Sequence, residues 1–125
     1  MKTKVKDLTI WITGASGGIG ESLSIALAKR GASIILSGRD KDKLEAVKSR
    51  CKNSKKHIVV SFDIADAAQA KEAYETIKAQ TGKVDWLINN AGVSQRSLIM
   101  ETTEDVERQI MEIDYFAQTR LTRLV

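Results

Sequence analysis

Short apolar runs alternate with longer amphipathic segments along this chain of 125 residues. The short runs are rich in isoleucine, valine and leucine and have the length of buried strands. In the longer segments, apolar residues recur at spacings of three and four, which indicates helices. We therefore predict strands at about residues 8–13, 33–37, 58–62 and 84–89, each followed by a helix.

The first two predicted helices have recognisable ends. The first is expected to end at Gly31, because a glycine readily takes the left-handed conformation that closes a helix. The second is expected to begin at about Lys41, with the Asp40 side chain as its N-cap. The apolar face of the first helix comprises Ile19, Leu23, Ala26 and Leu27.

The last two predicted helices have equally regular apolar faces. The third helix has Ala70, Ala73, Tyr74 and Ile77 on one face and ends near Gly82. The fourth runs over about residues 103–125, and we expect its apolar stripe to lie on the sheet. That stripe comprises Val106, Ile110, Ile113 and Ala117, and the helix also carries Leu121 and Leu124.

The alternation of strand and helix predicts an α/β fold, a doubly wound parallel sheet of the Rossmann type. Parallel strands covered on both faces are almost continuously apolar, as these runs are. Right-handed crossovers then give the strand order 3-2-1-4. We expect residues 1–125 to form one domain, because the length suits one domain and no linker or repeat interrupts it.

A glycine-rich turn joins the first strand to the first helix. Residues 13–20 read TGASGGIG. Gly14, Gly18 and Gly20 permit the turn, the approach of a pyrophosphate and close packing of helix on strand. Ser16 can donate a hydroxyl to a phosphate or ribose. Such turns also occur without a ligand, but the position of this one inside a β–α unit favours nucleotide binding.

A second glycine motif, NNAG at residues 89–92, follows the fourth strand. In the order 3-2-1-4 the first and fourth strands are neighbours at the point where the order reverses. Both glycine motifs then lie on one crevice at the carboxyl ends of these strands. This coincidence indicates a dinucleotide site more strongly than either motif alone.

Charge leaves a second class of function open. The formal net charge is +4, and lysines cluster near the N-terminus and between residues 48 and 56. A basic cluster can bind nucleic acid, but here no aromatic residues interleave the charges and no DNA-binding motif appears. We interpret the cluster as a solvated face and expect no nucleic-acid partner. No apolar run is long enough to span a membrane, so no membrane partner is expected.

The cysteine and histidine content points away from disulfide and metal chemistry. Cys51 is the single cysteine and is in register with Leu44 and Val47, so we predict a small core residue. One thiol excludes an internal disulfide and fits a reducing, cytoplasmic location. His57 is the single histidine and has no ligand pattern around it, so no metal site is expected.

TGASGGIG, then Asp63, then NNAG resemble, in this order, the short-chain dehydrogenase/reductase family, and these landmarks run through the whole chain. The resemblance implies an enzyme that transfers hydride between a nicotinamide cofactor and an alcohol or carbonyl compound. The stretch NNAGVSQRSLIMETT is most similar to the branch of carbonyl, retinoid and steroid reductases. The chain is expected to stop before the family's fifth strand.

The resemblance also implies roles for residues around the crevice. Ile19 faces the nicotinamide side, Asp63 meets the adenine amino group and Ile64 packs on the adenine. Asn90 braces the sheet and the cofactor loop, while Ala91 and Gly92 leave room for the nicotinamide ribose. As an alternative or additional role, Asp63 is a candidate N-cap for the third helix.

Residues 37–39, Ser-Gly-Arg, indicate the cofactor. NAD-binding folds place a carboxylate on the ribose 2′-hydroxyl about 20 residues after the glycine loop. The position that matches the family's acidic residue is Gly38, and Arg39 follows it. A guanidinium can hold a 2′-phosphate that a carboxylate would repel. We therefore predict NADP(H), against the alternative that Arg39 is simply a solvent-exposed residue.

No catalytic residue is assigned to this chain. Tyr74 and Lys78 have the family's Tyr-x-x-x-Lys spacing, but they precede NNAG on the third helix, outside the crevice, and we reject them. The family's tyrosine, lysine and serine come from elements after NNAG, so the chain alone is expected to be inactive. Asp114 stands where the family has an asparagine of a proton relay, and it lacks the amide donor.

Two function hypotheses follow. The first is an NADP(H)-dependent oxidoreductase acting on a small carbonyl or alcohol substrate. The alternative is an NADP-binding module or sensor that performs no chemistry. Met111, Tyr115 and Phe116 lie beyond the stripe of the last helix, so we expect a homo-oligomer through residues 103–125 or burial under a further part of the protein.

Overall fold

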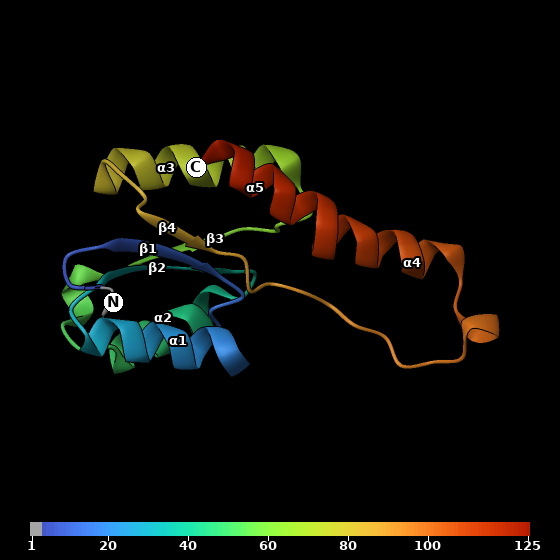
Figure 1. Ribbon diagram of the computed structural model, residues 1–125, viewed down its shortest axis with the longest axis horizontal. Helices are drawn as coiled ribbons and strands as arrows, with labels where there is room; N and C mark the ends of the chain where they lie inside the picture. The colour runs from blue at the N-terminus through green and yellow to red at the C-terminus, as the bar shows by residue number, and fades with distance from the viewer. Residues whose placement is uncertain (1–3) are drawn as a thin grey trace.

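The structure is a computed structural model that describes residues 4–125. Its centre is a parallel sheet in the order β3-β2-β1-β4, with strands β1 (Thr9–Thr13), β2 (Ser33–Gly38), β3 (Ile58–Ser61) and β4 (Trp86–Ile88). Helices α1 (Gly18–Lys29) and α2 (Lys41–Arg50) cover one face (Figure 1). Helices α3 (Ala67–Thr81) and α5 (Gln118–Leu124) cover the other (Figure 1). The predicted doubly wound Rossmann fold and strand order are confirmed.

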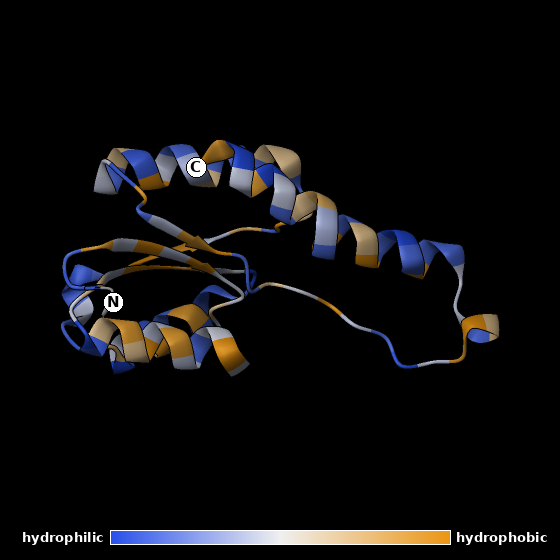
Figure 2. Cartoon of the chain, in the orientation of Figure 1, coloured by the Kyte–Doolittle hydropathy of each residue, from blue (hydrophilic) through white to orange (hydrophobic). Residues whose placement is uncertain are grey.

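Alternation along the central strands divides the core in two. On β1, Ile10 and Ile12 belong to the cluster beneath α1 and α2, whereas Trp11 belongs to the cluster beneath α3 and α5. Successive side chains of a strand point to opposite faces, so one apolar run supplies both clusters. On β2, Ile34 and Leu36 belong to the first of these clusters and Ile35 to the second. Figure 2 shows this apolar colouring of the strands between the helix layers.

The predicted helix ends are largely present. Gly31 follows α1 with a φ of +95°, and its N–H and that of Ala32 bond back to the last turn of the helix. Asp40 is the N-cap of α2 and accepts from the Lys43 N–H at 3.1 Å. Asp63, however, is not the cap of α3. The N-cap of α3 is Asp66, which accepts a hydrogen bond from the Gln69 N–H. This hydrogen bond holds the pKa of the Asp66 carboxyl below its usual value.

Cys51 and His57 are both structural. Cys51 is a buried free thiol in the cluster with Leu44 and Val47, as predicted, and burial raises its pKa. The buried His57 ring accepts from the Ile34 N–H at 3.0 Å through Nδ1 and lies 2.8 Å from the Lys52 carbonyl through Nε2. This pattern requires the neutral ring with the proton on Nε2.

The last predicted helix is continuous but leaves the sheet. Helix α4 (Glu104–Met111), a π-helical segment η3 (Glu112–Ala117) and α5 follow one another without a break. Ala117 is buried, as expected for the sheet-facing stripe, and Leu121 is buried in the cluster with Trp11 and Ile77. The expectation that Val106 and Ile110 also face the sheet is wrong, because α4 projects beyond it and neither residue joins an apolar core (Figure 1).

The segment between β4 and α4 is the least covered part of the described chain. It runs out from the sheet to a short 3₁₀ turn, η2 (Ile99–Glu101), before α4 begins (Figure 1). Leu98, Ile99 and Met100 are exposed there, and Figure 2 shows apolar colouring at this turn beside a mostly polar α4. Between residues 4 and 125 no helix has the length and apolarity needed to cross a bilayer.

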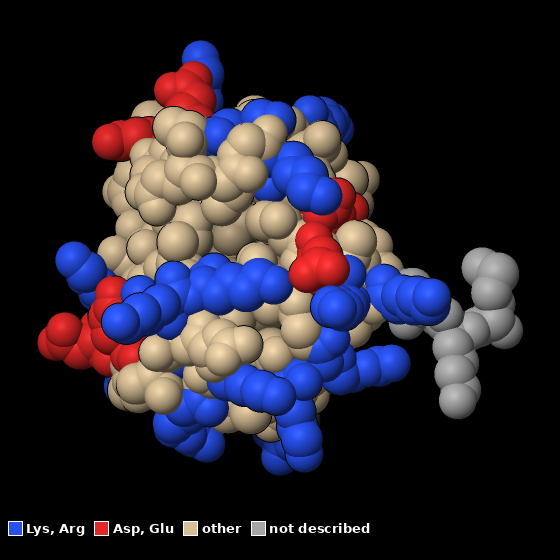
Figure 3. Space-filling view, turned by 90° about the vertical axis from the view of Figure 1, so that its left-hand side faces the viewer, with Lys and Arg blue, Asp and Glu red and all other residues tan. Residues whose placement is uncertain are grey.

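The basic residues gather at the other end of the molecule (Figure 3). Their segments precede the strands: Lys4 and Lys6 come before β1, Arg30 before β2, and a second 3₁₀ turn η1 (Ser54–Lys56) before β3. Lys52, Lys55 and Lys56 are all exposed in this region. The cluster therefore lies at the amino ends of parallel strands, away from the edge where both glycine motifs lie.

Candidate functional site

A pocket of about 420 Å³ opens at the carboxyl ends of the strands. This is the edge at which doubly wound sheets bind ligands. Its wall is made by the last residues of β1 and β2, the segments that follow all four strands, the start of α1 and one residue of η3. The lining residues are Thr13, Gly14, Ser16, Gly17, Ile19, Ser37, Gly38, Arg39, Phe62, Asp63, Ile64, Asn90, Ala91, Gly92, Val93 and Ile113.

Most of the predicted cofactor-binding residues meet at this pocket. Those that line it are Gly14, Ser16, Ile19, Arg39, Asp63, Ile64, Asn90, Ala91 and Gly92. Gly18 and Gly20 do not line it, and Gly17 does. Gly18 has a φ of +56° at the start of α1, and a Cβ there would meet nothing within 4 Å, so its role is the turn itself.

Gly20 is needed where the helix meets the two glycine motifs. A Cβ on this residue would lie 2.2 Å from the Gly14 carbonyl oxygen and 2.6 Å from Asn90 Nδ2. Gly14 itself has a φ of +65°, and its own Cβ would lie 2.9 Å from the Ala91 Cα. Both glycines therefore let the loop after β1 touch the segment after β4.

Thr13 and Asn90 join these two segments by hydrogen bonds. The buried Thr13 Oγ1 accepts from the N–H of Asn90 at 3.1 Å and from that of Ala91 at 3.0 Å. The Asn90 amide in turn donates to the carbonyls of Thr13 and Gly14. The bracing role expected for Asn90 thus has a specific form, and Thr13 is the partner that the sequence analysis did not identify.

At the end of β2 the pocket wall carries one positive charge. Arg39 is exposed and follows Gly38, and a Cβ on Gly38 would lie 3.7 Å from Ser16 Oγ. Asp40 is the nearest carboxylate along the chain, and it is occupied as the N-cap of α2. The pocket therefore offers the Ser16 hydroxyl and the Arg39 guanidinium at the end of β2, while the Asp40 carboxylate binds the start of α2.

After β3, the backbone curls around Asp63. Its Oδ1 accepts from the Ala65 N–H at 3.0 Å, and its own N–H donates to Gln69 Oε1. The other carboxylate oxygen of Asp63, Oδ2, accepts no hydrogen bond within this turn. Ile64 lies beside Asp63 on the pocket wall, and both are half-buried.

The C-terminal helix reaches the pocket through its π-helical segment. Ile113 lines the pocket, although the sequence analysis assigned it to the sheet-facing stripe. Asp114 Oδ1 accepts from the Val93 N–H at 2.9 Å and lies next to Gly92. A π-turn widens the helix locally and changes which side chains face inward. The three- and four-residue spacing of apolar positions in the sequence contains no sign of such a turn.

Tyr74 and Lys78 lie outside the pocket, as expected. Tyr74 is on α3 and stacks on Trp11, with ring centroids 6.4 Å apart. Lys78 is exposed on the same helix. Neither residue contributes to the pocket wall, so their spacing reflects helix packing.

The remaining lining residues had no functional signal in the sequence. Ser37 and Phe62 are buried near strand ends, and Ser37 Oγ accepts from the Trp11 indole at 2.8 Å. Val93 follows the NNAG motif directly. Position at a strand's carboxyl end is the signal that finds Ser37 and Phe62, and it requires exact strand boundaries, whereas Val93 is found only by its place after NNAG.

Comparison with known proteins gives this pocket a family. The sequence profile of the family described as short chain dehydrogenase matches residues 8–125. The chain is 39% identical over 127 aligned residues to the human protein named dehydrogenase/reductase SDR family member 7. The alignment covers 98% of this chain and 38% of that relative, so the chain spans well under half of its length.

Solved structures agree with the sequence comparison. Gluconate 5-dehydrogenase from Burkholderia cenocepacia, in complex with NADP and tartrate, matches with a TM-score of 0.88 and 27% identity, over 98% of this chain and 48% of that one. The 3-ketoacyl-(acyl-carrier-protein) reductase from Brucella melitensis, complexed with NADH, matches with a TM-score of 0.89 and 28% identity, over 95% and 48%. The fold, the pocket at the strand ends and the matched profile together show that this chain belongs to the short-chain dehydrogenase/reductase family.

Proposed function

We propose that the protein containing this chain is an NADP(H)-dependent oxidoreductase that acts on an alcohol or carbonyl compound. The observation that carries the choice of cofactor is Arg39 on the pocket wall beside Gly38, where a carboxylate would select NAD. Family membership supports a nicotinamide cofactor. The two solved relatives described above contain NADP in one case and NADH in the other, so the choice depends on this chain's own residues.

The residues that line the pocket support one orientation of a bound dinucleotide. The start of α1 and the backbone of Gly14 and Gly17 suit a pyrophosphate, since a helix N-terminus offers free N–H groups and a positive dipole end. Arg39 and Ser16 lie toward β2, so a 2′-phosphate and its adenosine belong on the β2–β3 side. The nicotinamide half then extends along Asn90 to Val93 on the β4 side.

In this proposal the chain's residues bind and orient the cofactor. When bound, the nicotinamide supplies the hydride chemistry. Asp63 and Ile64 hold the adenine, and Asn90, Ala91 and Gly92 form the wall beside the nicotinamide ribose. We assign no catalytic residue within the chain, and the proton donor belongs to a part of the protein beyond the family's NNAG motif.

Titration with the two cofactors tests the proposal. A charge-assisted hydrogen bond contributes about 1.5–3 kcal/mol, so NADPH should bind the full-length protein about 10- to 150-fold more tightly than NADH. Arg39→Ala should remove most of this difference. Lys41→Ala is the matched control, because Lys41 is exposed two residues away and does not line the pocket. Equal affinities of the unaltered protein for the two cofactors would refute the choice of NADP(H).

Two further expectations remain proposals. Met111, Tyr115 and Phe116 are exposed on the C-terminal helix, which supports a homo-oligomer through residues 103–125. The buried free thiol of Cys51 is compatible with the cytoplasmic location expected from the sequence.

A further inference from the structure

The C-terminal helix holds the segment after β4 by a row of side chains spaced four residues apart. Asp114 Oδ1 accepts from the Val93 N–H at 2.9 Å. Gln118 Nε2 donates to the Ala91 carbonyl at 2.9 Å. Asn89 Nδ2 donates to Thr122 Oγ1 at 3.1 Å. Three helix positions thus meet alternate residues of an extended segment that runs in the opposite direction.

The spacing explains why this row works. Four residues of a helix advance about 6 Å, and two residues of an extended chain advance about 6.6 Å. Positions 118 and 122 of α5 therefore stay in step with positions 91 and 89, and Asp114 of the π-helical segment continues the row at position 93. Of the three contacts, only the one made by Gln118 holds the carbonyl of Ala91, the central residue of the segment.

The segment is fixed from both sides. On its other side, Thr13 and the Gly14 backbone hold Asn90 and Ala91 as described above. Gln118 is half-buried and closes the opposite side of the Ala91 peptide.

A neighbouring residue of the same helix reaches the other wall. Arg120 Nη2 pairs with Glu112 Oε1 at 2.7 Å, and Nη1 donates to the Ile64 carbonyl at 3.4 Å. Its side chain is 27% exposed, so the guanidinium lies partly beneath the surface. Ile64 is on the pocket wall after β3, on the side assigned to adenosine.

We infer that Gln118 and Arg120 are positioning residues that set the two halves of the cofactor pocket separately, Gln118 the nicotinamide half and Arg120 the adenosine half. The inference rests on the proposed function, because that function assigns the two halves. The geometry behind it is that one helix contacts both walls through different side chains. Neither residue lines the pocket itself.

The experiment compares two ligands on the full-length protein. NADPH occupies both halves, whereas adenosine 2′,5′-bisphosphate occupies only the adenosine half. Gln118→Met keeps the length of the side chain and removes its donor. It should weaken NADPH about two- to tenfold and leave the bisphosphate unchanged. Arg120→Met should weaken both ligands by a similar factor, about threefold, because its contact is longer, and Arg120→Lys should recover part of that loss.

Matched substitutions control for changes of composition. Gln109→Met makes the same change on the exposed face of α4, and Arg123→Met makes it on the exposed last turn of α5. Both should leave the two dissociation constants within experimental error. Gln118→Asn, which keeps the amide but shortens the side chain, should repeat the effect of Gln118→Met and serves if that variant does not fold.

The outcomes separate the two proposals. A Gln118 variant that weakens both ligands equally, or neither, overturns this inference while the unaltered protein still binds NADPH. A folded, unaltered protein that binds neither ligand overturns the proposed function and this inference with it. Selective loss of NADPH affinity at Gln118, with parallel loss of both affinities at Arg120, supports the inference.

Discussion

Strands β1 and β4 are neighbours, and their surroundings differ completely. All five residues of β1 are buried, and Trp11 is 0% exposed between β2 and β4. In β4, Trp86 is 38% exposed, because β4 pairs with β1 alone and forms an edge of the sheet. Each strand carries one of the chain's two tryptophans, in registers that pair Ile10 with Trp86 and Trp11 with Leu87. Burial here is set by the neighbours on either side and not by the apolar run itself.

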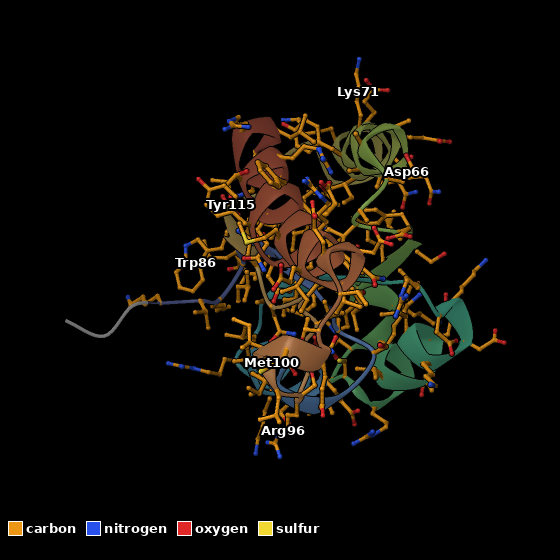
Figure 4. The ribbon with its side chains drawn as sticks, turned by 90° about the vertical axis from the view of Figure 1, so that its right-hand side faces the viewer. Asp66, Lys71, Trp86, Arg96, Met100 and Tyr115 are labelled. Carbon is orange, nitrogen blue, oxygen red and sulfur yellow. The ribbon has the colours of Figure 1, made fainter. Side chains whose placement is uncertain are left out.

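The contrast extends to everything that follows β4. Trp86 and Tyr115 lie on the same side of the molecule, and Met100 and Arg96 belong to the projecting segment that faces the viewer (Figure 4). Tyr115 and Phe116 pack edge to face with ring centroids 5.2 Å apart, yet both remain about half exposed. The β1 side is a finished core, whereas the β4 side, here called the open side, leaves Trp86, Tyr115 and Phe116 partly exposed.

The two tryptophans give the largest expected difference. Trp11→Ala should lower the free energy of unfolding by about 3–5 kcal/mol, because it empties a buried site and leaves Ser37 Oγ without its indole donor. Trp86→Ala should cost about 1 kcal/mol or less, because that ring is partly in water. Urea unfolding followed by circular dichroism measures both values.

Similar losses at the two positions would contradict the contrast. They would mean that β4 is covered in the full-length protein as completely as β1 is. The open side would then be a buried interface. In that case Trp86→Phe, which keeps most of the apolar area, should lower the free energy of unfolding much less than Trp86→Ala does.

His57 tests the finished side by its pH dependence. Burial lowers the pKa of the ring below its ordinary 6.5, and the acceptor role of Nδ1 toward Ile34 requires the neutral form. The unfolded chain takes up the proton first as the pH falls. The stabilisation by His57 is therefore present above pH 6.5 and is lost as the pH falls toward the folded-state pKa.

The expected slope is at most about 1.4 kcal/mol per pH unit below 6.5. His57→Gln should be less stable at neutral pH and should lack this part of the slope. Unfolding midpoints between pH 7.5 and 5.5 give the comparison. A wild-type stability that rises on acidification through this range would contradict the neutral, buried ring.

Phe116 tests the open side and has the smallest expected effect on stability. Phe116→Asp should change the free energy of unfolding of a monomer by only about 0.5 kcal/mol, because the ring is 51% exposed. In a symmetric dimer the substitution occurs twice across the axis, so it should dissociate the oligomer. Light scattering on the full-length protein measures the mass.

Gln109→Asp, on the exposed polar surface of α4, is the matched control and should leave the mass unchanged. A wild-type protein that is already monomeric at working concentration would refute the interface. The apolar groups around Phe116 would then belong under another part of the same protein.

The β-α pattern and the glycine motifs were sufficient to predict the fold. The alternation of apolar runs and helical faces led to the strand order, and TGASGGIG and NNAG led to the edge where the pocket lies. The prediction failed at α4, where the stripe through Val106 and Ile110 continues beyond the edge of the sheet. Periodicity reports which residues share a helix face, but it does not report where the underlying sheet ends.

The sequence by itself therefore determined the order of the strands, the cap at Asp40, the left-handed Gly31 after α1, and the glycines that bring β1 and β4 together. These depend on local backbone freedom and on spacing, which are properties of short segments. Only the tertiary structure decided that Thr13 holds Asn90, that Asp66 caps α3, and that Gln118 and Arg120 reach opposite walls of the pocket. The cap at Asp66 is local and depends on where α3 begins, whereas the other contacts join residues far apart in the chain. The directions of their side chains are settled only when the sheet and helices are packed.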